Sequence, residues 1–412
     1  MSKNIFKFIL VFVLLFCLSS SILFVFADTK SKLTTDNTAN DLTYTDMESL
    51  FSDKIFVDED GEIELKIEKD PELEDLLAKC KKKGLKFGLA LGSGSARGLA
   101  HVGVIQVLEA YGIPVDMIAG TSIGSVVGSV YATGASVKQM KESALAMKHR
   151  KSFALFDPTI PRSGLISGNR AEEILNSIAL KDKTFDNLKI PFAAVATDIK
   201  TGAKVILNQG SVIKAVRASI SIPGIFTPVK YQDYYLVDGG VVDPVPVDVV
   251  QKMGADIIIA VSLTEKTPKP IVMIVNKETG DLKEVEDSFT FEINIKEIQK
   301  FKTVEKITSL VEKEVTSLGK RIKVVKKKFE GPHIIEVISK SVDIMEKEIT
   351  SRGLDKADIV IVPFGIEGIS LFEFDKADTT IKGGIDATLA EIPQIKKVTK
   401  EKLRATEEFK NF

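Results

Sequence analysis

The sequence FGLALGSGSARGLAHVGVI, residues 87–105, joins a short apolar run to an amphipathic run through a glycine-rich turn. Residues 87–91 are typical of a buried strand, and Val102, Ile105 and Leu108 recur at the spacing of a helix face. Further strand-like runs, most of them separated by segments of helical periodicity, occur at 115–119, 192–196, 205–207, 257–261 and 359–362. This alternation predicts an α/β fold with three layers, α/β/α, around a mostly parallel central sheet.

The turn at Gly92–Gly98 lies where such sheets bind their ligands, just beyond the carboxyl end of a strand. Its glycines permit positive φ angles, and the first N–H groups of the following helix have no partner within the helix, so the turn could hold an anion. Arg97 stands where a dinucleotide-binding turn needs glycine, and Arg97-Gly98 does not supply the lysine of a P-loop. The alternative is a tight turn with no ligand.

A second candidate site is Gly120-Thr121-Ser122-Ile123-Gly124, between a strand-like run and an apolar helix. This context favours a nucleophile elbow, a sharp turn that lifts the hydroxyl of Ser122 above the sheet, with Gly120 and Gly124 leaving room for close packing. The alternative is that Ser122 simply caps the helix.

A serine needs a base to become a nucleophile. His101 falls within the helix behind the glycine-rich turn and His149 within a basic cluster, so we expect neither to serve. Asp238, in Asp238-Gly239-Gly240 at the end of a short strand, is the better candidate, although Asp-Gly is also a common hairpin turn. A free Asp, with a pKa of about 3.9, is a weak base for serine, so burial or hydrogen bonds would have to tune this pKa.

Together these three motifs resemble the patatin-like phospholipases, most closely the bacterial members. The family combines a glycine-rich oxyanion turn ending in Arg-Gly or Lys-Gly, a Gly-x-Ser-x-Gly elbow and an Asp-Gly-Gly segment, in that order. Here they are Gly92–Gly98, Gly120–Gly124 and Asp238–Gly240. The resemblance covers about residues 86–262 and resumes from 333 to about 387.

The resemblance implies hydrolysis of acyl esters of phospholipids or similar lipids through a covalent acyl-serine. Ser122 would attack the ester and Asp238 would accept its proton. Backbone N–H groups of Gly94, Ser95 and Ala96 would hold the oxyanion, steadied by Arg97. The motif glycines would support this geometry: Gly92, Gly98, Gly120, Gly124, Gly239 and Gly240. The family needs no metal and no organic cofactor, but it often has glycine where Ser93 and Ser95 stand here, and serine resists positive φ.

Two alternative functions stay open. The order Ser122, Asp238, His333 also fits a Ser-Asp-His triad of the α/β-hydrolase type, although His333 opens an amphipathic segment with Ile338, Val342, Met345 and Ile349 at helical spacing. The other alternative is a catalytically inactive, exported lipid-binding or scaffold protein.

The N-terminal segment 1–27 reads as a signal peptide or a membrane anchor. Lys3 and Lys7 precede an apolar stretch over residues 8–26. We therefore expect an exported protein of the cell envelope or periplasm, or a secreted one, which residues 8–26 could anchor to the membrane. Residues 28–84 are predicted to form an acidic tether or appendage, with a hairpin between 54–57 and 62–67 and a helix over 71–82.

The catalytic domain is predicted to comprise residues 85–263 and 333–395, followed by a charged tail at 396–412. An insertion at 264–332 separates its two parts. Within the insertion, residues 276–282 resemble a hairpin turn between 271–275 and a strand near 289–295. Residues 296–330 form a basic amphipathic segment, either a solvated helix or one that contacts an anionic membrane.

Composition excludes several classes of protein. The 412 residues include 56 Lys and Arg against 57 Asp and Glu, so a net charge of −1 provides no field to recruit nucleic acid. Cys17 and Cys80 are the two cysteines, and there are three histidines. A disulfide framework or a cysteine-rich zinc site is therefore excluded, and little is left from which to build another metal centre. No internal repeat is evident, and the sequence leaves the oligomeric state open.

Overall fold

The computed structural model describes residues 54–57, 63–149, 157, 163–264, 272–275, 282–285, 334–366 and 368–408. The predicted signal peptide or anchor at 1–27 and the basic segment at 296–330 lie outside these residues, as does His333.

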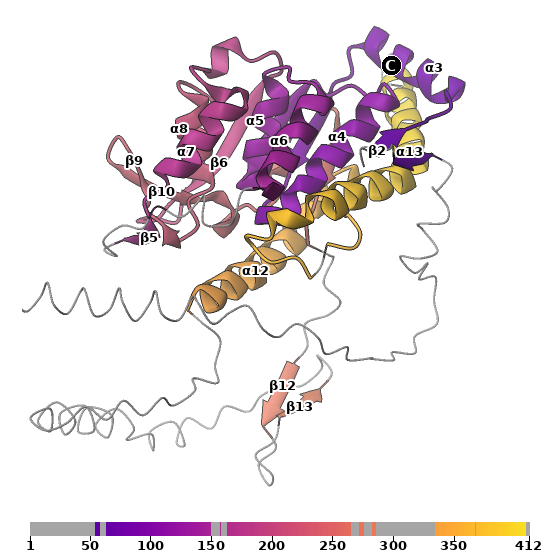
Figure 1. Ribbon diagram of the computed structural model, residues 1–412. Coiled ribbons are helices and arrows are strands. Elements are labelled where there is room, and N and C mark those ends of the chain that lie inside the picture. The colour runs from indigo at the N-terminus through magenta and orange to yellow at the C-terminus, as the bar shows by residue number, and fades with distance from the viewer. Residues whose placement is uncertain are drawn as a thin grey trace, which may run out of the picture. The chain divides into compact units, whose positions relative to one another are not determined.

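An eight-stranded sheet forms the centre of the described structure (Figure 1). Its order is β14-β11-β3-β4-β6-β10-β9, with β7 also paired to β6. The strands from β14 to β6 are parallel, whereas β7, β10 and β9 are antiparallel to their neighbours. The strands are β3 Phe87–Leu91, β4 Met117–Thr121, β6 Phe192–Asp198, β7 Lys204–Leu207, β9 Val229–Tyr231, β10 Tyr234–Asp238, β11 Ile257–Val261 and β14 Ile359–Ile361.

Helices cover both faces of this sheet, which confirms the predicted three layers. Figure 1 shows α4, α5 and α6 side by side on one face, where α13 also packs against α4. The short α9 packs against β3, β4 and β11 on the other face. The helices are α3 Pro71–Lys83, α4 Ala100–Ala110, α5 Ile123–Ala132, α6 Val137–His149, α7 Asn169–Leu175, α8 Val212–Ser219, α9 Val247–Lys252, α12 Ile334–Gly353 and α13 Ala377–Glu408.

Alternation along the strands explains why the sheet has one hydrophobic core on each face. In β11, Ile257, Ile259 and Val261 join the large core beneath α4, α5 and α13, whereas Ile258 and Ala260 join the small core beneath α9. Successive side chains of a strand point to opposite faces, so a strand that is apolar throughout must be covered on both.

Two predicted segment boundaries differ from the structure. The helix predicted in the appendage is α3, but its buried Leu73 and Cys80 belong to the large core, so residue 84 does not separate it from the catalytic domain. The predicted charged tail at 396–412 is, as far as Glu408, the continuation of α13, with Val398 and Leu403 buried. The sequences of α3 and of the C-terminal part of α13 resemble those of solvated helices, because each of these helices buries only a narrow apolar stripe.

Three small two-stranded sheets complete the described structure. The hairpin of β1 Ile55–Val57 with β2 Ile63–Leu65 confirms its prediction. β12 Val272–Val275 pairs with β13 Leu282–Val285, so the predicted return strand near 289–295 is wrong. The nearer strand closes a shorter loop, which costs less chain entropy. Sequence reasoning did not identify the parallel pair of β5 Gly164–Ile166 with β8 Gly224–Phe226.

Candidate active site

Ser122 occupies a strained turn between β4 and α5. Its φ of 53° and ψ of −124° place a non-glycine residue at positive φ, which strains the backbone. The strain is supported locally, because the Ser122 N–H donates to the Ser219 hydroxyl at 2.9 Å and that hydroxyl donates to the Val195 carbonyl at 2.6 Å. The Ser122 side chain makes no capping hydrogen bond to α5, so the alternative of a simple helix cap is wrong.

The glycines of the elbow allow backbones to approach closely. A Cβ on Gly124 would overlap the Leu91 carbonyl oxygen, and one on Gly120 would overlap the Gly124 carbonyl. Backbone atoms cannot move aside as a flexible side chain can, so these positions require glycine for space. The same holds at Gly239 against Val195, and Gly98 makes room for the side chain of Ile123.

Asp238 meets Ser122 although the two residues are 116 positions apart. The Ser122 Oγ donates to Oδ2 of Asp238 at 2.6 Å. The other carboxylate oxygen, Oδ1, accepts from the Gly240 N–H at 2.8 Å, and the Thr197 hydroxyl donates to the Asp238 carbonyl at 2.9 Å. Asp238 ends β10 beside β6, so it does not lie in a hairpin turn.

Burial makes Asp238 a stronger base than a free aspartate. Loss of hydration raises the pKa of Asp238 to about 7, against the opposing effect of the hydrogen bonds from Ser122 and Gly240. A carboxylate whose pKa lies near neutrality can accept the serine proton and return it later. The serine and the aspartate therefore form a buried hydrogen-bonded pair, called the dyad below, whose carboxyl group has a pKa near neutrality.

The glycine-rich turn presents two unused N–H groups. Gly94, with a φ of 152°, precedes the 3₁₀ helix η2 (Ser95–Leu99), and Ser95 adopts a φ of 51°. Within the described structure, the N–H groups of Gly94 and Ser95 have no hydrogen-bond acceptor. The Ala96 N–H donates to the Leu371 carbonyl at 3.2 Å. In this conformation the donors left for an oxyanion are Gly94 and Ser95, and Ser95 does take the positive φ that serine resists.

Two side chains fix this turn. Nε of the buried Arg97 donates to the Gly94 carbonyl at 3.3 Å, and its Nη2 donates to Asp343 of α12 at 2.7 Å. His101 is fully buried, and its Nε2 donates to the Gly92 carbonyl at 2.8 Å. Burial lowers the pKa of His101 to about 4, so its ring is neutral at physiological pH. His101 therefore shapes the turn and does not contact Ser122.

Sequence reasoning missed the contribution of α12 and of Ser219. Glu346 of α12 is buried beside Gly240, and Asp343 pairs with Arg97. One signal was present: Glu346 lies four residues after Val342, on the apolar stripe that the segment buries, where an acid is out of place. The role of Ser219 could not be predicted from the sequence, because it depends on where α8 ends.

Several absences hold for the described part of the chain. No group of three or more His, Cys, Asp or Glu side chains there could hold a metal ion. We find no helical segment there with both the length and the hydrophobicity of a membrane span. Cys80 is buried and free.

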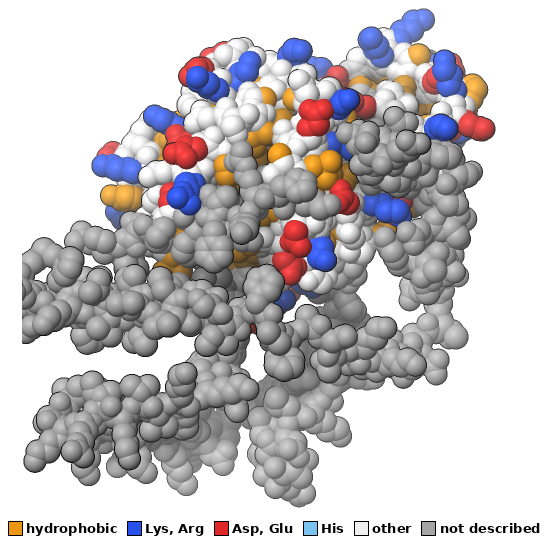
Figure 2. Space-filling view, in the orientation of Figure 1, with side chains coloured by type: hydrophobic (Ala, Val, Ile, Leu, Met, Phe, Trp, Pro, Cys, Tyr) orange, Lys and Arg blue, Asp and Glu red, His pale blue; other side chains and the backbone are white. Residues whose placement is uncertain are grey.

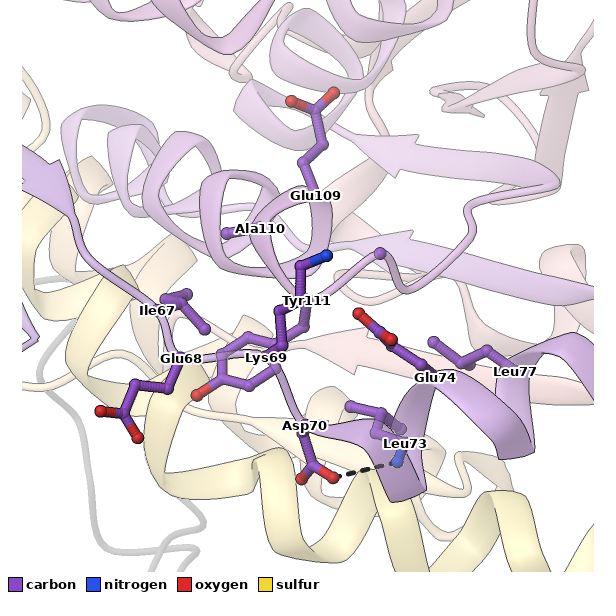
Figure 3. Close-up of a pocket in the computed structure, with 11 residues that line it drawn as sticks. Ile67, Glu68, Lys69, Asp70, Leu73, Glu74, Leu77, Glu109, Ala110 and Tyr111 are labelled. Carbon is purple, nitrogen blue, oxygen red and sulfur yellow. Dashed lines mark hydrogen bonds between the residues drawn. The ribbon is translucent and has the colours of Figure 1, made fainter.

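A pocket of about 330 Å³ lies away from the dyad, between the start of α3 and the end of α4 (Figure 3). Asp70 lines it and caps α3 by accepting from the Leu73 N–H. None of the dyad, elbow or oxyanion residues lines this pocket. We therefore assign it no part in the chemistry.

Comparison with known proteins adds an independent observation. Residues 89–250 match the family model described as patatin-like phospholipase, and this range contains the glycine-rich turn, Ser122 and Asp238. An NTE family protein of Mycobacterium tuberculosis is 40% identical over 187 residues, which cover 45% of this chain and 51% of that protein.

Two eukaryotic proteins are also similar. Patatin-like phospholipase domain-containing protein 6 of Homo sapiens is 34% identical over 185 residues, or 44% of this chain and 13% of that protein. Lysophospholipase nte1 of Aspergillus fumigatus is 38% identical over 193 residues, or 45% of this chain and 12% of that protein. The chain spans about half the length of the mycobacterial relative and a much smaller part of these two.

Proposed function

Because residues 89–250 form a patatin-like phospholipase domain, we propose that the protein is a serine hydrolase that cleaves acyl ester bonds of lipids. The observation that carries the proposal is the 2.6 Å hydrogen bond from Ser122 to a buried carboxylate whose pKa is raised to about 7. Phospholipids or lysophospholipids are the proposed substrates, and the names of the similar phospholipase and lysophospholipase proteins support this class.

In the first half of the proposed reaction, Oγ of Ser122 attacks the ester carbonyl carbon while Asp238 takes the hydroxyl proton. The carbonyl oxygen becomes an oxyanion, which the N–H groups of Gly94 and Ser95 stabilise. The tetrahedral intermediate collapses, the bond to the alcohol oxygen breaks, and Asp238 gives its proton to the departing alcohol. An acyl-serine results.

In the second half, water replaces the alcohol. Asp238, again ionised, takes a proton from the water. At the same time the water oxygen attacks the acyl carbon of the acyl-serine. A second oxyanion forms at the same N–H groups. Its collapse breaks the bond to Oγ, returns the proton from Asp238 to Ser122 and releases the fatty acid.

Ester and phospholipid hydrolysis by the full chain tests this function. We expect Ser122→Ala and Asp238→Asn each to lower kcat/KM by about a thousandfold or more without a change in fold. Ser129→Ala is the control, because the Ser129 hydroxyl donates to Val126 within α5 and takes no part in the dyad. Hydrolysis by Ser122→Ala at the wild-type rate would exclude the proposal.

Two further variants of this experiment address the alternatives. A Ser-Asp-His triad would make His333→Ala lose activity on the order of a thousandfold with its fold intact, whereas the dyad predicts no such loss. If the protein is an inactive lipid-binding or scaffold protein, a fluorophosphonate probe should not label the wild-type chain. The dyad predicts labelling of wild type and no labelling of Ser122→Ala.

A lipid surface is the proposed partner of the rim around the dyad. Tyr234 and Tyr235 are exposed at the start of β10, the strand that ends at Asp238, and the exposed Ile199, just after β6, donates its N–H to the Tyr235 carbonyl. Val337, Ile344 and Met345 are exposed on α12, which contacts Gly240. Exposed apolar side chains beside a lipid-cleaving site favour contact with acyl chains or the membrane interface.

The charge distribution supports a lipid partner over nucleic acid. Among the described residues on the face shown in Figure 2, Lys and Arg lie interspersed with Asp and Glu and form no basic stripe. Binding of nucleic acid relies on such a stripe.

Flotation with phosphatidylcholine vesicles tests the lipid surface. Tyr234→Ser with Tyr235→Ser, and Ile344→Ser with Met345→Ser, should each reduce recovery several-fold, whereas Ile206→Ser on β7 should not. Flotation of a chain that lacks residues 264–330 with anionic vesicles tests whether the basic segment binds the membrane. Unchanged recovery of that chain would remove the segment from the proposal, and unchanged recovery of both double variants would remove the rim.

Export is a separate proposal, supported by Lys3 and Lys7 before the apolar residues 8–26. Cell fractionation followed by mass spectrometry of the N-terminus tests it. A mature protein beginning at Asp28 in the envelope or medium would indicate a cleaved signal peptide. An intact N-terminus in the membrane fraction would indicate an anchor, and an intact protein in the cytosol would contradict export.

A further inference from the structure

A buried carboxyl group that the proposed mechanism does not use lies next to the dyad. Glu346 of α12 is 5% exposed. Burial of an ionised carboxylate costs several kcal/mol unless it is paired and hydrogen-bonded. The surroundings of Glu346 must therefore explain how this acid is accommodated.

Glu346 touches both turns that form the site. The Ser93 hydroxyl in the glycine-rich turn donates a hydrogen bond to its carboxyl group, which by itself lowers the pKa of Glu346. On the dyad side, a Cβ built on Gly240 would overlap Oε1 of Glu346 and would lie 3.2 Å from Oδ1 of Asp238. The two carboxyl groups thus approach the same α-carbon, and Glu346 bridges the oxyanion turn and the dyad turn.

The cation near Glu346 already has another partner. Three charged side chains act on it: Asp238, Asp343 and Arg97. Arg97, the cation, is paired with Asp343 at 2.7 Å. Asp238 must be ionised to take the proton of Ser122. A negative charge on Glu346 would then have no partner, and two carboxylates that share a buried site do not both ionise readily.

We propose that Glu346 is a positioning residue of the dyad, held as the neutral acid between Ser93 and Gly240 so that Asp238 alone carries the negative charge of the site. Burial first, and the charge of Asp238 second, raise the pKa of Glu346 to about 8. Above that pH, Glu346 would place a second negative charge beside the turn that must stabilise an oxyanion. This inference rests on the proposed function for its effect on rate.

The pH dependence of kcat/KM for a soluble ester, measured with the full chain, tests the inference. Wild type should show a bell-shaped profile whose alkaline limb has its midpoint near pH 8. Glu346→Gln keeps the size and neutrality of the protonated acid, so it should retain at least about a third of the activity at pH 7 and lose the alkaline limb. Glu348→Gln, on an exposed side chain of the same helix, is the matched control and should keep the bell shape.

Two outcomes would overturn the inference. One is an alkaline limb that persists unchanged in Glu346→Gln. The other is a variant that folds but is as inactive as Ser122→Ala, because the ionised form of Glu346 would then be the required one. A purely structural acid would lower activity equally at every pH and would leave the limb in place.

An infrared measurement reads the proton without using activity. In Asp238→Asn the dyad acid is removed, so a band of a neutral carboxylic acid at pH 7 should come from Glu346 and should vanish when Glu346→Gln is added. If the added substitution prevents folding, the pH can be raised to 10 in Asp238→Asn instead. The band should then disappear, because Glu346 loses its proton. Absence of the band at pH 7 overturns the inference. If Asp238→Asn shows the band but the wild-type protein has no esterase activity, the proposed function alone is refuted.

Discussion

Ser122 and Asp238 each depend on a neighbour that does no chemistry. The hydroxyl of Ser219 satisfies the backbone N–H of Ser122 in its strained turn, and Thr197 holds the backbone of Asp238. Strained residues persist only where the surrounding structure holds them in place. The reactive geometry is therefore a property of four residues from four elements.

We predict that Ser219→Ala lowers kcat/KM about tenfold to a hundredfold. The substitution leaves the buried N–H of Ser122 without an acceptor, which costs free energy. The elbow would shift to give this N–H another partner, and Ser122 would move out of its reactive position. Steady-state kinetics should show the loss mainly in kcat, while circular dichroism shows a native fold. Ser129→Ala, a hydroxyl removed from within α5, should stay within about twofold of wild type. Equal rates for wild type and Ser219→Ala would show that the elbow does not need this support.

The raised pKa of Asp238 predicts how the reaction responds to acid. Only the ionised carboxylate can accept the serine proton, so the acid limb of kcat/KM should rise tenfold per pH unit below about pH 7 and flatten near that pH, before the alkaline limb proposed for Glu346 begins. A pH–rate profile with an ester that does not ionise in this range measures the midpoint. A midpoint near 4, the value of a free aspartate, would show that burial does not tune the base.

At the scale of elements, the first and last described helices complete the large core together. α3 buries Leu73 and Cys80, and the C-terminal half of α13 buries Ile395, Val398 and Leu403. Lys396 of α13 pairs with Asp70, the capping residue of α3, at 2.9 Å. The two ends of the domain therefore stabilise each other, although their charged surfaces suggested a tether and a tail.

Truncation distinguishes a packed helix from a tail. Removal of residues 396–412 exposes the partners of Val398 and Leu403 and should lower the free energy of unfolding by roughly 3–6 kcal/mol, at about 1.5–3 kcal/mol per buried side chain. Removal of residues 409–412 alone, beyond the end of α13, should change it by less than about 0.5 kcal/mol. Urea denaturation measures both. Identical midpoints for the two truncated chains would mean that residues 396–408 contribute nothing to the core.

At the scale of the whole molecule, the pKa values that burial shifts determine how stability varies with pH. Asp238 and Glu346 have raised pKa values, because burial favours their neutral forms. Asp248, held by Lys204 and Lys252, has its pKa lowered to about 2. The first two groups retain protons that the unfolded chain loses near pH 4, whereas Asp248 is ionised in both states above about pH 5.

We therefore predict that Asp238 and Glu346 lower the free energy of unfolding as the pH rises. The contribution of Asp238 and Glu346 is complete below about pH 4 and is lost as the pH passes through their folded pKa values, near 7 and 8. Relative to the double variant Asp238→Asn with Glu346→Gln, wild type should lose on the order of 1.4 kcal/mol per pH unit for each group between pH 5 and 7. Urea midpoints at pH 5, 6, 7 and 8 measure this. Parallel curves for the two proteins would contradict it.

Much of the fold and the pairing of Ser122 with Asp238 followed from the sequence. Strand, turn and helix periodicities are local, so β3, β11, α3 and the elbow could be placed from neighbouring residues alone. Where periodicity was ambiguous, prediction was wrong: the partner of β12 was misplaced, and Met345 was put on the buried stripe of α12 although Glu346 is buried there.

What the tertiary structure alone decided depends on contacts between residues distant in the chain. The 2.6 Å hydrogen bond of the dyad joins residues 116 positions apart, and the ion pair of Arg97 with Asp343 joins residues 246 apart. Burial sets the pKa of Asp238, and the carbonyl of Leu371 leaves Gly94 and Ser95 as the free donors. Residue types and their spacing specify which groups can react. Solvation and hydrogen bonding, which specify how they react, exist only once the chain has folded.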